Sequence, residues 1–197
     1  MSIARAGRPA RALAEVVRVS RVLGSLLLTV LLLGCSAAPA PAPTSSESFT
    51  TTDVAWLQLA EALHTRALPL LELAGDRAAD PPLAGLAARL GEEHESERGR
   101  LRALLAQARV TGENPHEQHD MPGMPTAADL DALSGLRDEA FDRRFVTLLR
   151  AYLKQLALVA DGEQNAGGAQ QARELAAAMR REHTADLAEL DRVAGRP

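Results

Sequence analysis

The chain has 197 residues, a formal net charge of −4 at pH 7, and only one Trp, one Tyr and three Phe. This length favours a single domain of modest size, and so few aromatic residues argue against a large β-sandwich. Ala, Leu, Arg and Glu dominate the chain and favour helices, so an all-α fold is expected. No block of Lys or Arg occurs beyond the N-terminus, which argues against nucleic-acid binding.

The first 34 residues have the pattern of a bacterial lipoprotein signal peptide. Five arginines precede an uncharged apolar run over residues 22–33. A helix of that length spans about 18 Å, which is short of the roughly 30 Å hydrocarbon core of a membrane, so the run predicts an export signal. It ends in the lipobox-like sequence LLGC, whose Cys35 is the only cysteine. We therefore expect Cys35 to be lipidated.

Lipidation of Cys35 would anchor the protein to the outer face of the bacterial cell membrane. The alternative is a buried free thiol, but the position directly after an apolar run favours lipidation. Residues 35–48 are rich in Pro, Ala and Ser and predict an extended tether. Residues 49–197 are then expected to form the folded domain.

An internal repeat organises residues 49–197. A shift of 89 residues aligns Asp53 with Asp142 and His94 with His183. The repeated unit is a helical hairpin, which is too small to bury a core by itself. Two copies are therefore expected to form a ferritin-like four-helix bundle.

Caps and turn residues predict four long helices and one short one. The first is expected to end at Gly75, with a kink or early break at Pro69, because proline has no amide hydrogen. The second is expected to begin after Asp80, which is a good N-cap residue. The predicted ranges, in chain order, are about 52–74, 81–110, 126–136, 138–160 and 169–193.

Polar residues interrupt the apolar seams of the second and fourth long helices at the same place. His94 is followed by Glu97, and its repeat equivalent His183 is followed by Asp186. A spacing of three places both side chains of each pair on one helix face, toward the bundle interior. An antiparallel hairpin would bring His64 of the first helix level with them. The candidate interior set is His64, His94, Glu97, His183 and Asp186, with Glu61 at its edge.

This interior set has two interpretations. Imidazole and carboxylate groups suit a divalent ion such as zinc or copper(II), which makes a metal site one of them. The other is a hydrogen-bonded polar layer without a metal, in which the carboxylates pair with the histidines or with Arg150. Both interpretations remain open from the sequence.

The loop over residues 111–125 offers a second candidate site. His116, His119, Met121 and Met124 combine imidazole with thioether, and these groups are soft enough for copper(I). The alternative is a flexible loop in which the two methionines pack beneath neighbouring prolines, because methionine is more often a filler than a ligand.

The sequence resembles the bacterial domain-of-unknown-function 305 proteins, a ferritin-like all-α group common among exported proteins. The resemblance spans about residues 49–193 and rests on DVAWLQLAEALH, HDMPGM, FDRRFVTLL and the paired late helices. It implies a helical bundle and, as in some members, handling of copper or another metal. The family's second His-His pair is replaced here by Tyr152-Leu153, and His94 and His183 occupy positions where members carry Gln.

Catalysis is not expected from this sequence. No Ser/His/Asp or Cys/His nucleophile arrangement and no glycine-rich phosphate loop can be recognised, and only Glu61-His64 has the Glu-x-x-His order of a di-iron oxidase. The sequence predicts a membrane-anchored, exported lipoprotein that binds copper or zinc. The alternative is a metal-free structural or interaction module that contacts another protein of the cell envelope.

Overall fold

The computed structural model describes residues 48–195, which contain five helices and no strands. The helices are α2 (Thr51–Arg77), α3 (Pro81–Gln107), α4 (Ala127–Ser134), α5 (Asp138–Ala166) and α6 (Gln170–Ala194). The prediction of an all-α fold is confirmed. The predicted signal peptide, Cys35 and nearly all of the predicted tether lie outside the described residues. None of the described helices is long and apolar enough to cross a membrane.

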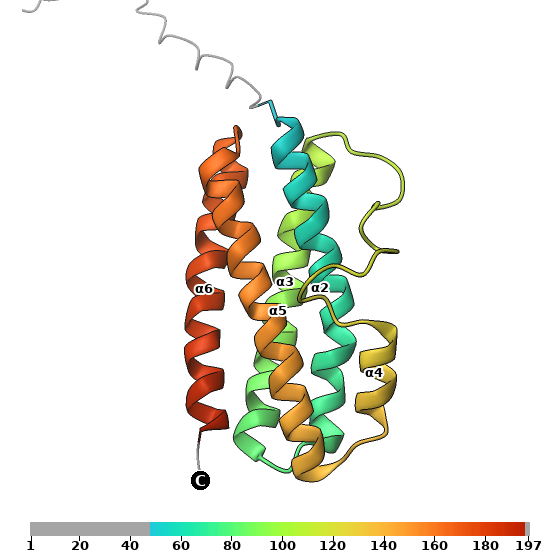
Figure 1. The fold of residues 1–197 in the computed structure, drawn as a ribbon. Helices are drawn as coiled ribbons and strands as arrows, with labels where there is room; N and C mark the ends of the chain where they lie inside the picture. Colours follow the sequence, from blue (N-terminus) through green and yellow to red (C-terminus); the bar gives the residue numbers. More distant parts are fainter. Residues whose placement is uncertain (1–47, 196–197) are drawn as a thin grey trace, which may run out of the picture. The chain divides into compact units, whose positions relative to one another are not determined.

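The four long helices form a bundle of two hairpins, as the internal repeat predicts. The helices α2 and α3 pack as one hairpin, and α5 and α6 pack as the other (Figure 1). The hairpins meet where α2 packs on α5 and α3 packs on α6, and the α3–α6 contact is the looser of the two. The short helix α4 lies outside the bundle, against α2 and α5.

The apolar core has two parts. The larger part surrounds Phe141, Phe145 and Leu153, and the smaller one surrounds Trp56 and Leu101. Along α3 and α6, the residues of the first part are separated from those of the second by a short stretch of buried polar side chains. Buried polar groups require partners, so this stretch is the part of the bundle whose chemistry must be explained.

Two helices extend further than the sequence predicts. The helix α2 continues through Pro69 and Gly75 to residue 77, and α5 continues through Gly162 to residue 166. The predicted ends at residues 74 and 160 were therefore wrong. A glycine costs a helix only about 1 kcal/mol, which is less than the roughly 1.5–3 kcal/mol gained by burying one large apolar side chain, so packing determines where the helix ends.

The repeat also appears in the way the two hairpins cap each other. Asp53 of α2 accepts hydrogen bonds from the backbone N–H groups of residues 168–169, at 2.8 and 3.1 Å, directly before α6. Its repeat equivalent Asp142 of α5 accepts from residues 79–80, at 3.1 and 3.0 Å, directly before α3. Each hairpin thus supplies the carboxylate that stabilises a helix start in the other hairpin.

A chain that ends at Val110, and so keeps only the first hairpin, is expected not to fold cooperatively. Its helices would lose the apolar faces of α5 and α6, together with the Asp142 carboxylate at the start of α3. Thermal melting followed by circular dichroism should show a mostly helical, cooperative transition for residues 36–197. A similar transition in the truncated chain would contradict the account of mutual burial.

A buried carboxyl pair lies at the Asp53 cap. Burial, together with the nearby carboxylate of Asp53, raises the pKa of Glu163 to about 8. Burial opposes ionisation of Asp53 as well, but hydrogen bonds from Thr50 and from the backbone hold the pKa of Asp53 well below its ordinary value. The folded protein therefore holds a proton on Glu163 at neutral pH.

The Glu163→Gln variant is expected to gain stability relative to the native protein as the pH rises. The pKa of Glu163 is higher in the folded chain, at about 8, than its ordinary value of 4.5, so its stabilising contribution is complete below pH 4.5 and is lost as the pH rises through 8. Glutamine stays neutral at every pH. Denaturant unfolding at several pH values measures the unfolding free energy of both proteins. The advantage of the variant should grow between pH 4.5 and 8. An advantage that does not change with pH would contradict the raised pKa of Glu163.

Candidate metal centre

Four buried side chains from three helices converge in the polar stretch of the core. His64 comes from α2, His94 and Glu97 come from α3, and His183 comes from α6. One nitrogen or oxygen atom from each lies within 4.8 Å of the corresponding atoms of the other three. Each of these residues is at most 2% exposed. The structure thus brings together four of the interior residues singled out in the sequence, and we call them the inner group.

Backbone carbonyls fix the orientation of two of the imidazole rings. The Nδ1 atom of His64 lies 2.7 Å from the carbonyl oxygen of Ala60, and Nδ1 of His94 lies 3.0 Å from that of Leu90. A carbonyl oxygen can only accept, so each Nδ1 must carry the proton and donate it. In a neutral ring the Nε2 atom is then left with a free lone pair, directed at the inner group.

The Glu97 carboxylate is the shared partner of the inner group. Its Oε2 atom lies 2.8 Å from Nε2 of His64 and 3.3 Å from Nε2 of His183. A carboxylate oxygen and a ring nitrogen attract each other at these distances when a proton or a metal ion lies between them. The arrangement therefore suits a proton or a metal ion between the histidines and Glu97.

The electrostatics of the inner group assign charges to its members. Burial would raise the pKa of Glu97, but the imidazoles of His183 and His64 beside it hold it far below its usual range. Burial and the neighbouring His64 lower the pKa of His94 well below its usual value. Burial also opposes a charge on His183, but the nearby carboxylates of Asp186 and Glu97 raise its pKa to about 9. Without a metal, Glu97 is ionised, His94 is neutral and His183 holds a proton.

Three ring nitrogens of the inner group have no hydrogen bond among the described residues: both nitrogens of His183, and Nε2 of His94. The His183 nitrogens lie 3.3 and 3.6 Å from carboxylate oxygens of Glu97 and Asp186. Nε2 of His94 is buried, and its ring stacks on that of His183 with centroids 5.3 Å apart. An unpaired buried polar atom costs about 1–3 kcal/mol. A lone pair in this position, beside an ionised carboxylate, has the chemistry of a metal ligand.

Asp186 lies one step outside the inner group. Its Oδ2 atom is 3.6 Å from Nδ1 of His183, and its Oδ1 atom is 3.2 Å from the guanidinium of Arg89. It is the repeat equivalent of Glu97, but its side chain is one methylene shorter. Asp186 therefore supports His183 through its charge and without a hydrogen bond, from the side where carboxylates commonly lie behind metal-binding histidines.

Glu61 and the loop candidates lie elsewhere. Glu61 pairs with Arg102 at 2.8 Å and accepts from Asn114 at 3.0 Å, which joins α2 to α3 and to the loop. Arg66 of α2 donates to the carbonyl oxygens of residues 117 and 125, so the loop is fastened along α2.

The four loop candidates differ in burial. Met124 is 4% exposed and packs in the larger part of the core, and Met121 packs against this part of the core. His119 is exposed. Neither His116 nor His119 joins a group of three or more converging His, Cys or carboxylate ligands within the described part of the chain. The two methionines therefore pack in and against the larger part of the core.

Sequence reasoning overlooked Tyr152. Its fully buried ring lies 5.4 Å from that of His94 and 6.3 Å from that of His64, between centroids. The resemblance contained the necessary signal, because Tyr152 occupies a position where members carry a histidine. The ring closes the α5 side of the inner group.

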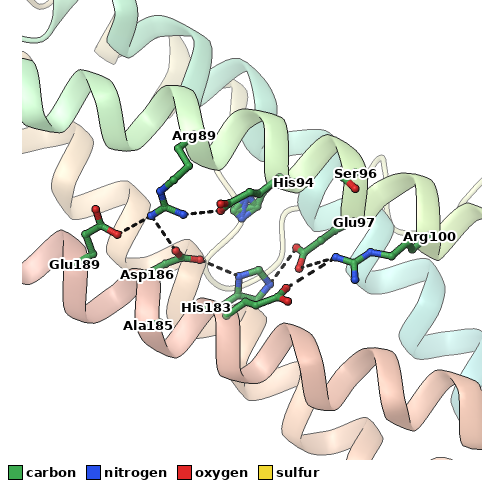
Figure 2. A pocket seen from close by; sticks show the side chains of 11 residues that line it. Arg89, His94, Ser96, Glu97, Arg100, His183, Ala185, Asp186 and Glu189 are labelled. Carbon is green, nitrogen blue, oxygen red and sulfur yellow. Dashed lines mark hydrogen bonds and ion pairs between the residues drawn. The ribbon is translucent and has the colours of Figure 1, made fainter. Parts of the chain in front are cut away.

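A cavity of about 420 Å³ lies beside the inner group and is lined by α3 and α6 (Figure 2). His94, Glu97 and His183 form part of its wall. Two arginines of α3 also line it, Arg89 and Arg100, which the sequence analysis did not single out. The inner group is therefore buried but borders a space large enough to hold water.

The fold and this group define an all-α bundle protein with histidine and carboxylate side chains gathered at its centre. The chain belongs to the family described as Domain of unknown function (DUF305), whose model matches residues 53–194. The resemblance seen in the sequence is thereby confirmed. No curated protein matches the chain.

Solved structures share the fold at low sequence identity. A DUF305 protein from Streptomyces coelicolor is 18% identical and has a TM-score of 0.65, covering 72% of this chain and 89% of its own. A DUF305 fragment from Deinococcus radiodurans is 19% identical, with a TM-score of 0.68, and covers 76% and 99%. CopM in a Cu(I)-bound form is 20% identical, with a TM-score of 0.61, and covers 73% and 95%.

Proposed function

We propose that this protein is a membrane-anchored, exported lipoprotein that binds one divalent metal ion, zinc or copper(II), in the inner group. The observation that carries the proposal is the convergence of four buried potential ligand atoms within 4.8 Å. His64, His94 and His183 would hold the ion through nitrogen, and Glu97 would hold it through oxygen. Three imidazoles and one carboxylate make a ligand set that suits zinc or copper(II).

The charges and donors of the site support a divalent ion. Glu97 supplies one negative charge directly, and Asp186 supplies a second behind His183. The inner group contains no sulfur, whereas copper(I) favours thiolate and thioether ligands. The likeness to CopM supports metal binding by this fold, and the donors found here favour the divalent state.

A metal-free module of the cell envelope is the alternative function. The ion pairs that Glu97 makes with His64 and His183 favour it, because a proton can replace the metal in the same arrangement. In that case the polar layer would fix the packing of three helices, and the surface of the bundle would contact an envelope protein. In both cases we propose a role in binding, without catalysis.

Metal binding is expected to release about one proton per ion at neutral pH, and the affinity should rise with pH until it approaches 9. The reason is that the ion must displace the proton on His183, whose pKa is raised to about 9. Calorimetry with Zn²⁺ in buffers of different ionisation enthalpy measures this release. Tight binding without proton release would contradict the role of His183 as a ligand.

The Cys35→Ser variant is expected to leave the membrane fraction or to remain unprocessed. The lipobox-like sequence ends at this residue, and the acyl chains attached there would hold the domain at the membrane. Cell fractionation together with the N-terminal mass tests the anchor. Native and variant chains with the same fractionation and the same N-terminal mass would contradict the lipoprotein assignment.

A further inference from the structure

We propose that Arg89 and Arg100 close the opening between α3 and α6, and that a metal ion enters and leaves the inner group there when their ion pairs with α6 separate. This inference rests on the metal binding proposed above and adds the route of the ion and its control. We call Arg89 and Arg100 the arginine pair.

The cavity between α3 and α6 is the natural route to the inner group. It is lined by three members of that group, whereas three other hollows on the described surface include none of them. On the α5 side, the fully buried ring of Tyr152 covers the histidines. The α3–α6 contact is also the looser of the two contacts between the hairpins, so an opening there disrupts the least packing.

Arg89 spans this opening on one side of the inner group. It extends from α3, and its guanidinium lies 3.2 Å from Asp186 and 2.7 Å from Glu189, both on α6 (Figure 2). A further contact at 2.6 Å, with Glu93 of its own helix, keeps the side chain in place. Arg89 therefore connects the two helices beside the carboxylate that supports His183.

Arg100 spans the opening on the other side. Its guanidinium lies 3.9 Å from Glu182 of α6 and 3.6 Å from Oε1 of Glu97. That oxygen is the one not directed at His64 and His183, so Arg100 contacts the outer face of the inner group. Figure 2 shows the arginine pair reaching from α3 toward α6 at separate points along the helices.

The strength of these ion pairs suits a reversible closure. The side chains of Arg89 and Arg100 are 38% and 47% exposed, so water and salt reach these ion pairs and weaken them. When they separate, carboxylates from α3 and α6 remain along the opening. The exposed acidic side chains would then attract a cation toward the buried ligands.

Exchange kinetics distinguish closure from simple repulsion. If the arginine pair only repels the cation, its removal raises the association rate and lowers the dissociation rate, because the bound ion becomes more stable. If the pair closes the route, its removal raises both rates. The dissociation rate therefore changes in opposite directions under the two mechanisms.

The test uses stopped-flow measurement of Zn²⁺ association, and of Zn²⁺ dissociation into excess chelator, with the native protein and the Arg89→Ala/Arg100→Ala variant. We expect both rates to rise at least fivefold in the variant. Moderate salt should speed dissociation from the native protein but not from the variant. Arg150→Ala is the matched control, because Arg150 pairs with Asp191 between α5 and α6, at 2.7 Å and away from this cavity. Its exchange rates should equal those of the native protein.

A dissociation rate that is unchanged or lower in the double variant would overturn the inference, and so would an equal acceleration in the Arg150→Ala variant. Equilibrium titration of the native protein with Zn²⁺ comes first and tests the proposed function separately. Failure to bind there would overturn metal binding itself, whereas binding with unaltered exchange would overturn only the role of the arginine pair. The salt dependence of native dissociation provides a test that needs no variant.

Discussion

The His94→Gln/His183→Gln variant is expected to bind zinc or copper(II) at least a hundredfold more weakly than the native protein, a loss of about 2.8 kcal/mol or more. The change removes two of the three imidazoles that converge on Glu97. Glutamine has a similar volume and is the residue type that the family resemblance implies at both positions. Helix content should therefore be unchanged, and titration calorimetry at neutral pH measures the difference in affinity.

The loop provides the control for this experiment. The His119→Ala/Met121→Ala variant should bind the ion as tightly as the native protein, because neither residue lies in the inner group. Binding that survives the glutamine changes and disappears with the loop changes would show that the loop is the site. A native domain without tight binding, whose glutamine variant differs only in stability, would support the metal-free polar layer.

The Asp53→Ala variant is expected to lose about 3 kcal/mol of unfolding free energy. Its carboxylate is fully buried and accepts hydrogen bonds from the backbone of Thr50 and of residues 168–169, and from the Thr50 hydroxyl. Alanine would leave several of these donors without an acceptor, at about 1 kcal/mol or more each. Denaturant unfolding near pH 6, where Glu163 stays protonated in the folded chain, measures the loss.

The repeat supplies a matched control for Asp53. Asp142→Ala removes the equivalent carboxylate in the other hairpin, but that side chain is only partly buried and accepts from residues 79–80 alone. Water can partly replace it, so we expect a loss of about 1 kcal/mol. Equal losses in the two variants would contradict the claim that burial of the Asp53 cap determines its larger contribution.

Periodicity and the repeat were sufficient to predict the bundle and most of the inner group. Apolar seams on four helices require a shared core, and the repeated interruption at His94 and His183 placed both histidines on the inner face. His64 was predicted to join them because an antiparallel hairpin brings its position in the first helix level with His94 in the second. These inferences depend on helix geometry, which is regular enough to extend across a whole element.

Side-chain reach was not predictable from the repeat. Glu97 and Asp186 occupy equivalent positions, but only Glu97 lies within reach of all three histidines. One methylene separates the two side chains, and Arg89 holds Asp186 at 3.2 Å. Which carboxylate enters the group therefore depends on distances of an ångström or so, and these depend on packing between helices.

Partners distant in the sequence were not predictable either. The aspartates 53 and 142 were aligned by the repeat, but their contacts with helix starts in the opposite hairpin depend on how the hairpins dock. The same is true of the arginine pair, whose partners on α6 lie about 80 to 100 residues further along the chain. A helical pattern fixes the face of a residue but not its neighbour across an interface.

Anomalous X-ray diffraction from crystals soaked in Zn²⁺ or Cu²⁺ tests the central claim most directly, because it locates the ion independently of any variant. The account predicts one strong peak per chain, bordered by His64, His94, Glu97 and His183, with zinc–nitrogen distances of about 2.0–2.1 Å. A strong peak at His116 or His119, or no peak in the bundle at saturating metal, would contradict it.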